Sequence, residues 1–161
     1  MKILHFSDPH AGGPAEDWMA YIDKRWVGVF NYRFRRQFRH DLTKLARAVE
    51  IDASLAGMQK VVGGLIEPFY PFEERVCIVC NEESKINGMR PNRSVKNDDG
   101  VMVDFIFGPA FICDCRGENL DSLSDEQIDR YGKMFRYPEH LARVNGTLFG
   151  IPYRPQPEQE R

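Results

Sequence analysis

This 161-residue chain contains several short β-favouring segments, and most of them are separated by turns rather than by regularly alternating helices. This pattern constrains the fold more than any other feature of the sequence. Apolar and β-branched composition predicts strands at residues 2–7, 65–70, 76–80, 101–107 and 110–114. Residues 49–52 alternate in polarity like an edge strand, and Asn145-Gly146 predicts the turn of a last hairpin over residues 143–153. Regular βαβ repeats do not occur, so the pattern predicts an α+β fold with a small mixed or antiparallel sheet.

Two segments carry helix signals. Ser54 is predicted as the N-cap of a helix over residues 55–62, which Gly63-Gly64 ends. Ser124 and Gln127 have the spacing of a capping box, and acidic residues fill the first turn of a helix that runs to about residue 135. These are the two main helices of the predicted fold.

Composition indicates an ordinary globular protein. Hydrophobic residues make up 42% of the chain and aromatic residues 12%, which is enough apolar surface for a core. No apolar run approaches the roughly 18–20 residues of a membrane span, and Asp8 interrupts the start before a signal region forms. We therefore expect a cytoplasmic protein with no membrane partner. The formal net charge of −2 makes nucleic acid an unlikely partner.

Charge and cysteine content divide the chain into two segments. Residues 1–50 carry nine Lys and Arg against six Asp and Glu, whereas the remainder carries 13 against 18. All four cysteines lie in the second part. Such shifts often mark separate units, so we predict an N-terminal strand–loop–helix segment at 1–48, a compact α+β domain at 49–153 and a flexible tail at 154–161.

The loop after the first strand carries Asp8 and His10. A carboxylate and an imidazole held at a strand end suit Mn, Fe or Zn. Residues 3–10, ILHFSDPH, resemble the first motif of the calcineurin-like metallophosphoesterases, and residues 31–41 resemble a later part of the same N-terminal segment. The Asp and His of that motif ligate one metal of a two-metal centre. The resemblance therefore implies metal ligation by Asp8 and His10 in a hydrolase whose metal-activated water attacks a phosphoester.

The later metal-site motifs of that family are missing. They are a G-D, a G-N-H-[DE], a further histidine and a G-H-x-H, and none of them occurs downstream. A catalytic metal usually has three protein ligands. The candidates to complete such a site are therefore Glu82, Asp104, Asp114 and His140, and without them the N-terminal segment is a truncated remnant.

An aromatic stripe follows in the same segment. Its members recur every fourth residue, at Trp26, Phe30, Phe34 and Phe38, and arginines lie off the stripe. We favour an amphipathic helix whose rings pack on the rest of the chain or on a second copy in a homo-oligomer. The alternative is nucleic-acid binding, with arginines on phosphates and rings under bases.

Most of residues 49–161 resembles a family of uncharacterised domains from bacteria, phages and mobile elements. The resemblance lies in short motifs, namely EID at 50–52, MQKVVGG at 58–64, YPF at 70–72, CNEE at 80–83, KING at 85–88, PNR at 91–93, DFIFG at 104–108 and SLSD at 122–125. It implies a compact domain and no particular reaction.

Polar residues crowd two predicted loops after strands in this domain. They are Asn81, Glu82, Asn87, Asn92 and Arg93, and such loops often bind a partner protein or a small ligand. The alternative is turn chemistry, because asparagine side chains close turns and Asn87-Gly88 suits positive φ.

The cysteines form two close pairs, Cys77-x-x-Cys80 and Cys113-x-Cys115. Four thiols are able to form a zinc site. Both pairs lie in predicted strands, however, where Cys77 and Cys80 face opposite sides while Cys113 and Cys115 share one. We therefore favour buried reduced thiols without disulfides.

Together these patterns favour a non-enzymatic binding or regulatory accessory protein of bacterial or phage type that contacts its partner through residues 81–93. The first alternative is a metal-dependent phosphoesterase that uses Asp8 and His10. The second is nucleic-acid binding through the arginine-rich aromatic helix.

Overall fold

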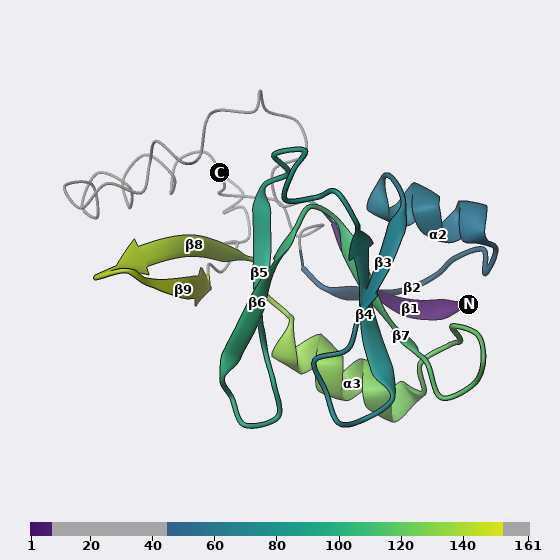
Figure 1. The fold of residues 1–161 in the computed structure, drawn as a ribbon. Coiled ribbons are helices and arrows are strands. Elements are labelled where there is room, and N and C mark those ends of the chain that lie inside the picture. Colours follow the sequence, from purple (N-terminus) through teal and green to yellow (C-terminus); the bar gives the residue numbers. More distant parts are fainter. Residues whose placement is uncertain (8–44, 153–161) are drawn as a thin grey trace, which may run out of the picture.

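A five-stranded antiparallel sheet in the order β2-β1-β7-β4-β3 forms the centre of the fold (Figure 1). The computed structural model describes residues 1–7 and 45–152. In sheet order the strands are Arg47–Glu50, Lys2–Phe6, Ala110–Asp114, Val76–Asn81 and Ile66–Phe69. In β7, Ile112 lies opposite Leu4 of β1 on one side and opposite Ile78 of β4 on the other. The predicted α+β class is confirmed.

Both faces of this sheet are buried. Because successive side chains of a strand point to opposite faces, Val76 and Ile78 of β4 enter one apolar cluster while Cys77 and Val79 enter another. In β7 the alternation continues, with Phe111 in the second cluster. A sheet of this kind needs a covering layer on each side.

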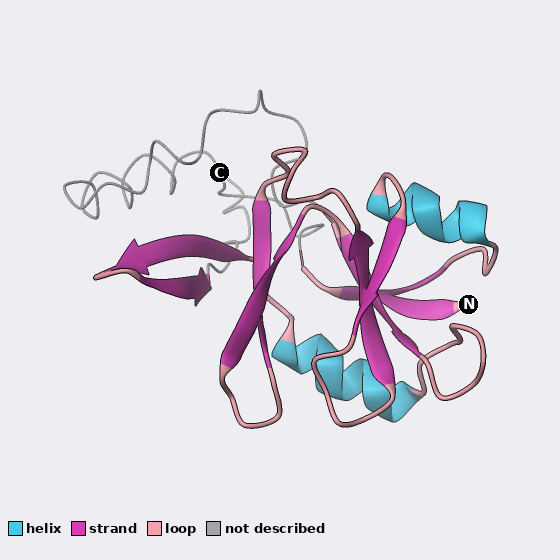
Figure 2. Ribbon diagram, viewed as in Figure 1, coloured by secondary structure: helices cyan, strands magenta, loops and turns pink. Residues whose placement is uncertain are grey.

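The two helices in the described part of the chain supply most of those layers (Figure 2). Helix α2 (Leu55–Val62) places Met58 and Val62 in the second cluster, and helix α3 (Asp125–Met134) places Tyr131 in the first. Both predicted N-caps are confirmed: the Ser54 side chain accepts from the Gly57 amide, and Ser124 forms the predicted capping box with Gln127.

Two hairpins complete the described chain. The first consists of β5 (Pro91–Lys96) and β6 (Met102–Phe107), and the second of β8 (Glu139–Val144) and β9 (Thr147–Pro152). The predicted last hairpin is confirmed, and it turns at Asn145-Gly146 with both residues at positive φ. Strand β5 was not predicted. Asn92 and Arg93 therefore lie in a strand, and the expectation that they occupy a loop is wrong.

Strand β1 is part of the main sheet, between β2 and β7. The N-terminal ammonium donates to the Ile51 carbonyl at 2.8 Å, and the Lys2 amide donates to the Ser122 hydroxyl at 3.0 Å. The expected boundary near residue 48 therefore does not separate residues 1–7 from the rest. The predicted metal loop, aromatic helix and tail (154–161) lie outside the described residues. No described helix has the length and apolarity needed to cross a membrane.

A buried polar network joins the end of β7 to α3. The Asp114 carboxylate is 4% exposed and accepts from the Arg116 amide and Nε at 2.8 and 2.7 Å, and from Gln127 Nε2 at 3.1 Å. Gln127 Nε2 also donates to Glu74 Oε1 at 2.9 Å. Burial raises the pKa of Asp114, but these hydrogen bonds and the Arg116 charge outweigh it and hold the pKa below its ordinary value.

We expect Asp114→Asn to destabilise the protein by about 1.5–3 kcal/mol at pH 7, because hydrogen bonds to a buried charged group are lost. Urea unfolding followed by circular dichroism measures this free energy. The matched control is Asp129→Asn, which removes an exposed ion pair with Lys133 and should cost less than about 0.5 kcal/mol. Equal effects of the two substitutions would contradict the network's role.

The same pair of proteins predicts a pH dependence. A carboxyl whose pKa is lowered by folding stabilises the native state above its ordinary pKa of 3.8, and this stabilisation is lost as the pH falls through the lower native value. The stability difference between wild type and Asp114→Asn should therefore be constant from pH 7 to about 5 and shrink below about 4. A difference that stays constant down to pH 2 would mean that the Asp114 charge contributes nothing.

Candidate functional site

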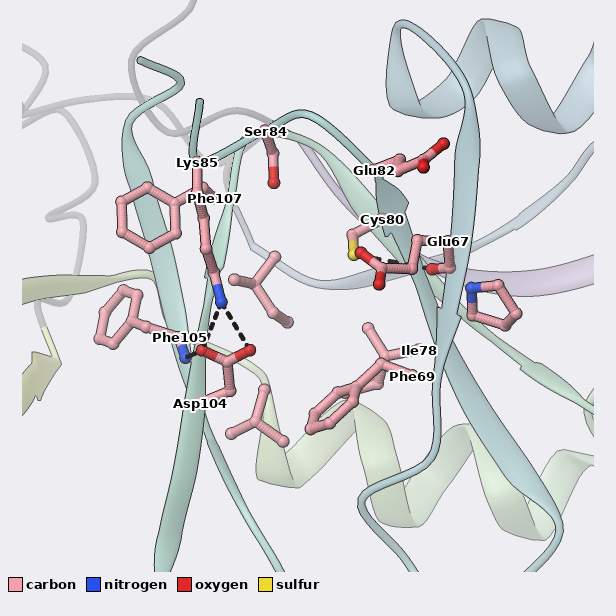
Figure 3. Close-up of a pocket in the computed structure, with 13 residues that line it drawn as sticks. Glu67, Phe69, Ile78, Cys80, Glu82, Ser84, Lys85, Asp104, Phe105 and Phe107 are labelled. Atoms are coloured by element: carbon pink, nitrogen blue, oxygen red, sulfur yellow. Dashed lines mark hydrogen bonds and ion pairs between the residues drawn. The ribbon is translucent and has the colours of Figure 1, made fainter. Parts of the chain in front are cut away.

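A hollow of about 150 Å³ lies between β3–β4 and the β5–β6 hairpin (Figure 3). Its walls come from four parts of the chain: β3, β4 with the turn that follows it, β5 and β6. The apolar walls include Phe69, Ile78 and Ile106, of which Ile78 and Ile106 belong to the first apolar cluster. The hollow therefore lies within the apolar layer on one face of the sheet. The β5–β6 hairpin and α3 together form this layer.

Four charged side chains line the hollow. Lys85 Nζ lies 2.7 Å from each carboxylate oxygen of Asp104, and both side chains are partly exposed. Glu67 and Glu82 add two carboxylates. In Figure 3 the Glu67 carboxylate is directed into the hollow, whereas Glu82 points away from it. Three acidic groups against one ammonium make the lining anionic.

Ser84 is the buried polar side chain of this lining. The residue is 4% exposed, and its hydroxyl is directed into the hollow (Figure 3). Its amide donates to the Asn81 carbonyl and its carbonyl accepts from the Met89 amide, each at 3.0 Å. The hydroxyl itself makes no hydrogen bond within residues 1–7 and 45–152. A buried hydroxyl without a partner is unfavourable by about 1–3 kcal/mol.

Asparagine side chains build the turn that holds Ser84. Asn81 Oδ1 accepts from the Glu83 amide at 2.9 Å, and Asn87 Nδ2 donates to Glu83 Oε2 at 3.2 Å. Gly88 closes the turn with a φ of +68°, a conformation that glycine adopts without strain. These contacts are those of the turn-chemistry alternative.

Asn92 and Arg93 are enclosed in the protein interior. They are 0% and 1% exposed. Asn92 Nδ2 donates to the Gly108 carbonyl at 2.7 Å, and Arg93 Nε donates to the Phe135 carbonyl at 2.7 Å. The Arg93 guanidinium also stacks over the Phe6 ring at 4.8 Å. Both residues hold β5 against the rest of the fold.

Of the five predicted binding residues, Glu82 alone is among the residues that line the hollow. The sequence prediction missed Glu67, Ser84 and Lys85, although it included the turn that carries Ser84. A single serine in a polar turn carries no functional signal, since its burial depends on the β5–β6 hairpin.

The predicted metal ligands are not brought together by the described residues. Asp8 and His10 lie outside them. Glu82 and Asp104 line the hollow, Asp114 belongs to the network with Arg116, and His140 is on β8, where burial lowers its pKa to about 4. Within residues 1–7 and 45–152, no three His, Cys, Asp or Glu side chains are grouped so that they could hold a metal ion.

The cysteines divide between the two faces of the sheet, as predicted. Cys77 and Cys113 lie opposite each other on β4 and β7, both fully buried, with their Sγ atoms 3.6 Å apart. Cys115 packs against the same cluster, whereas Cys80 packs against the other and lines the hollow. All four are free thiols, and the separation of Cys80 excludes a four-thiol zinc site.

These environments make the thiols unreactive. Burial raises the pKa of Cys80 and of Cys115 to about 11. The hydrogen bond with Cys113, together with burial, raises the pKa of Cys77 still further. Because the thiolate is the nucleophile, the raised pKa values keep Cys77, Cys80 and Cys115 in the less reactive thiol form.

We expect native Cys80 and Cys115 to react with iodoacetamide at pH 8 roughly 100-fold more slowly than a free cysteine, since their thiolate fraction is reduced in that proportion. Cys77 and Cys113 should react only through unfolding. Timed labelling followed by mass spectrometry measures each rate, and the urea-unfolded chain is the control in which all four react alike. Rapid labelling of Cys77 or Cys113 would contradict this assignment.

A family model described as "Domain of unknown function (DUF3846)" matches residues 38–136. This range contains every residue that lines the hollow. No curated protein and no solved structure matches the chain. The description names no phosphoesterase, and Asp8 and His10 precede the matched range.

Proposed function

The chain belongs to the DUF3846 family, and from the chemistry of its hollow we propose that it is a non-enzymatic binding or regulatory protein. The ligand occupies the hollow between β3–β4 and the β5–β6 hairpin. The observation that carries this proposal is the Ser84 hydroxyl, which is buried, directed into the hollow and without a hydrogen-bond partner among the described residues. A ligand that binds there supplies the missing hydrogen bond.

Binding is favoured over catalysis by the groups around Ser84. A serine nucleophile needs an adjacent base, and no histidine is among the described residues that line the hollow. Lys85 is held in an ion pair with Asp104, and the raised pKa of Cys80 leaves it protonated. The lining therefore offers hydrogen bonds, charge and apolar contact without an activated nucleophile.

The size of the hollow indicates what enters it. Pockets for drug-sized molecules and cofactors typically have volumes of about 300–1,000 Å³, whereas this one has about 150 Å³. A single side chain of a partner protein, or a metabolite of similar size, matches that volume better than a nucleotide or a flavin. Such limited recognition supports the proposed role as a binding or regulatory accessory protein.

We expect fragments of fewer than about ten non-hydrogen atoms to bind in the hollow, with the low affinity that such small ligands reach. Two-dimensional ¹H–¹⁵N spectra of the full chain, recorded with a fragment library, should show shifts at Phe69, Ser84 and Phe105. Residues of α3 such as Asp129 should not shift.

Two variants control this experiment. Glu67→Trp fills the hollow from an exposed position on β3 and should abolish the shifts, while Glu126→Trp on the exposed side of α3 should leave them unchanged. The proposal fails if no fragment shifts the residues of the hollow, or if the Glu67→Trp protein responds as the wild type does.

A further inference from the structure

We infer that the hollow binds an alkylammonium group, either the side chain of a lysine on a partner protein or a small free amine. This inference rests on the proposed binding function and specifies its ligand. It follows from the arrangement of acceptors, charge and apolar surface around Ser84.

Two polar side chains point into the hollow without an ion-pair partner among the described residues. The carboxylate of Glu67 accepts hydrogen bonds, and the hydroxyl of Ser84 is able to donate or accept them. Glu67 forms no ion pair with the described part of the chain, and its carboxylate points into the hollow (Figure 3). The Ser84 hydroxyl is able to accept a hydrogen bond at the same hollow. An ammonium group has three donors and no acceptor, which matches the ability of both residues to accept hydrogen bonds.

The charge of the lining selects a cation. The ammonium of Lys85 neutralises Asp104 at 2.7 Å, and Glu82 points away from the hollow (Figure 3), so the carboxylate directed into the hollow without a cation partner among the described residues is that of Glu67. An anionic ligand would meet this carboxylate without a free cation among the described lining residues. A neutral polar ligand would leave the Glu67 charge unpaired as it excludes water from it.

The apolar walls fit the stem of such a ligand. Phe69, Ile78 and Ile106 form apolar parts of the lining, and a lysine-like chain of methylenes buries well against surfaces of this type while its charged end stays at the polar rim. The volume of about 150 Å³ accommodates one such chain rather than a larger cationic cofactor.

Lys85 already places an ammonium group beside a carboxylate of the lining. Its own ammonium lines the hollow and pairs with both oxygens of Asp104. The incoming ammonium therefore binds beside a like charge, which weakens binding unless Lys85 moves outward. Replacing Lys85 by methionine keeps the apolar stem, removes that repulsion and frees Asp104 for the ligand.

The test uses butylammonium chloride, 1-butanol and sodium butyrate, which share an alkyl stem and differ in charge. In ¹H–¹⁵N titrations of the full chain at low salt, butylammonium should shift the amide signals of Ser84 and Glu67. Its affinity should be about tenfold higher than that of butanol or butyrate, as expected for a charge-assisted hydrogen bond. Equal affinities for the three ligands, or tighter binding of butyrate, would overturn the inference.

Matched variants locate the cation. Glu67→Gln should weaken butylammonium binding about tenfold and leave butanol unaffected, since it removes one charge-assisted contact. Glu126→Gln makes the same change of net charge on exposed α3 and should have no effect. Ser84→Ala should weaken binding, and Lys85→Met should strengthen it several-fold. An unchanged affinity in Glu67→Gln would overturn the inference.

One further ligand distinguishes the sources. A blocked Gly-Lys-Gly peptide that binds at least as tightly as butylammonium indicates a lysine of a partner protein, and a peptide that does not bind indicates a small amine. The two proposals also fail differently. If only neutral or anionic fragments shift the amide signals of residues that line the hollow, the proposed binding function stands and the alkylammonium inference is wrong. If no fragment shifts the hollow, both fall.

Discussion

Every residue of β7 is buried, and this constraint determines most of the architecture around it. Buried backbone groups must find hydrogen bonds, so β7 is paired along both edges, with β1 and with β4. Its side chains alternate between two apolar clusters, so each face of the sheet requires cover. Helix α2 supplies one layer, and α3 together with the β5–β6 hairpin supplies the other.

The hollow arises where that second layer is divided between two elements. Helix α3 packs on β1 and β2, while the β5–β6 hairpin contacts β4. The sheet ends at β3, whose Pro68 lacks the amide needed to extend pairing at that position. Between β3 and β6 no backbone hydrogen bonds join the strands, so side chains alone fill this part of the layer and a small space remains.

Local signals were sufficient for the elements whose residues match their environment. The caps Ser54 and Ser124, the turn at Asn145-Gly146 and strand β7 follow from short-range patterns that the tertiary structure preserves. Strand β5 begins Pro-Asn-Arg-Ser, a composition typical of a turn. It becomes a buried strand because two distant groups contact its Arg93 side chain. The Phe135 carbonyl accepts a hydrogen bond from it, and the Phe6 ring stacks against it. The hollow was unpredictable for the same reason, since its lining comes from four separate segments.

Most buried polar side chains in the described part of the chain have hydrogen-bond partners within the fold, whereas the hydroxyls of Ser84 and Ser94 have none there. Asn92, Arg93, Asp114 and Gln127 are buried with hydrogen-bond partners inside the fold, so the stability of the fold accounts for their presence. The hydroxyl of Ser84 is equally buried and has no such partner in the described part of the chain. This hydroxyl faces the hollow, so its hydrogen bond comes from whatever occupies the hollow. We propose that a ligand completes its hydrogen bonding, and the acidic lining around it favours a cation.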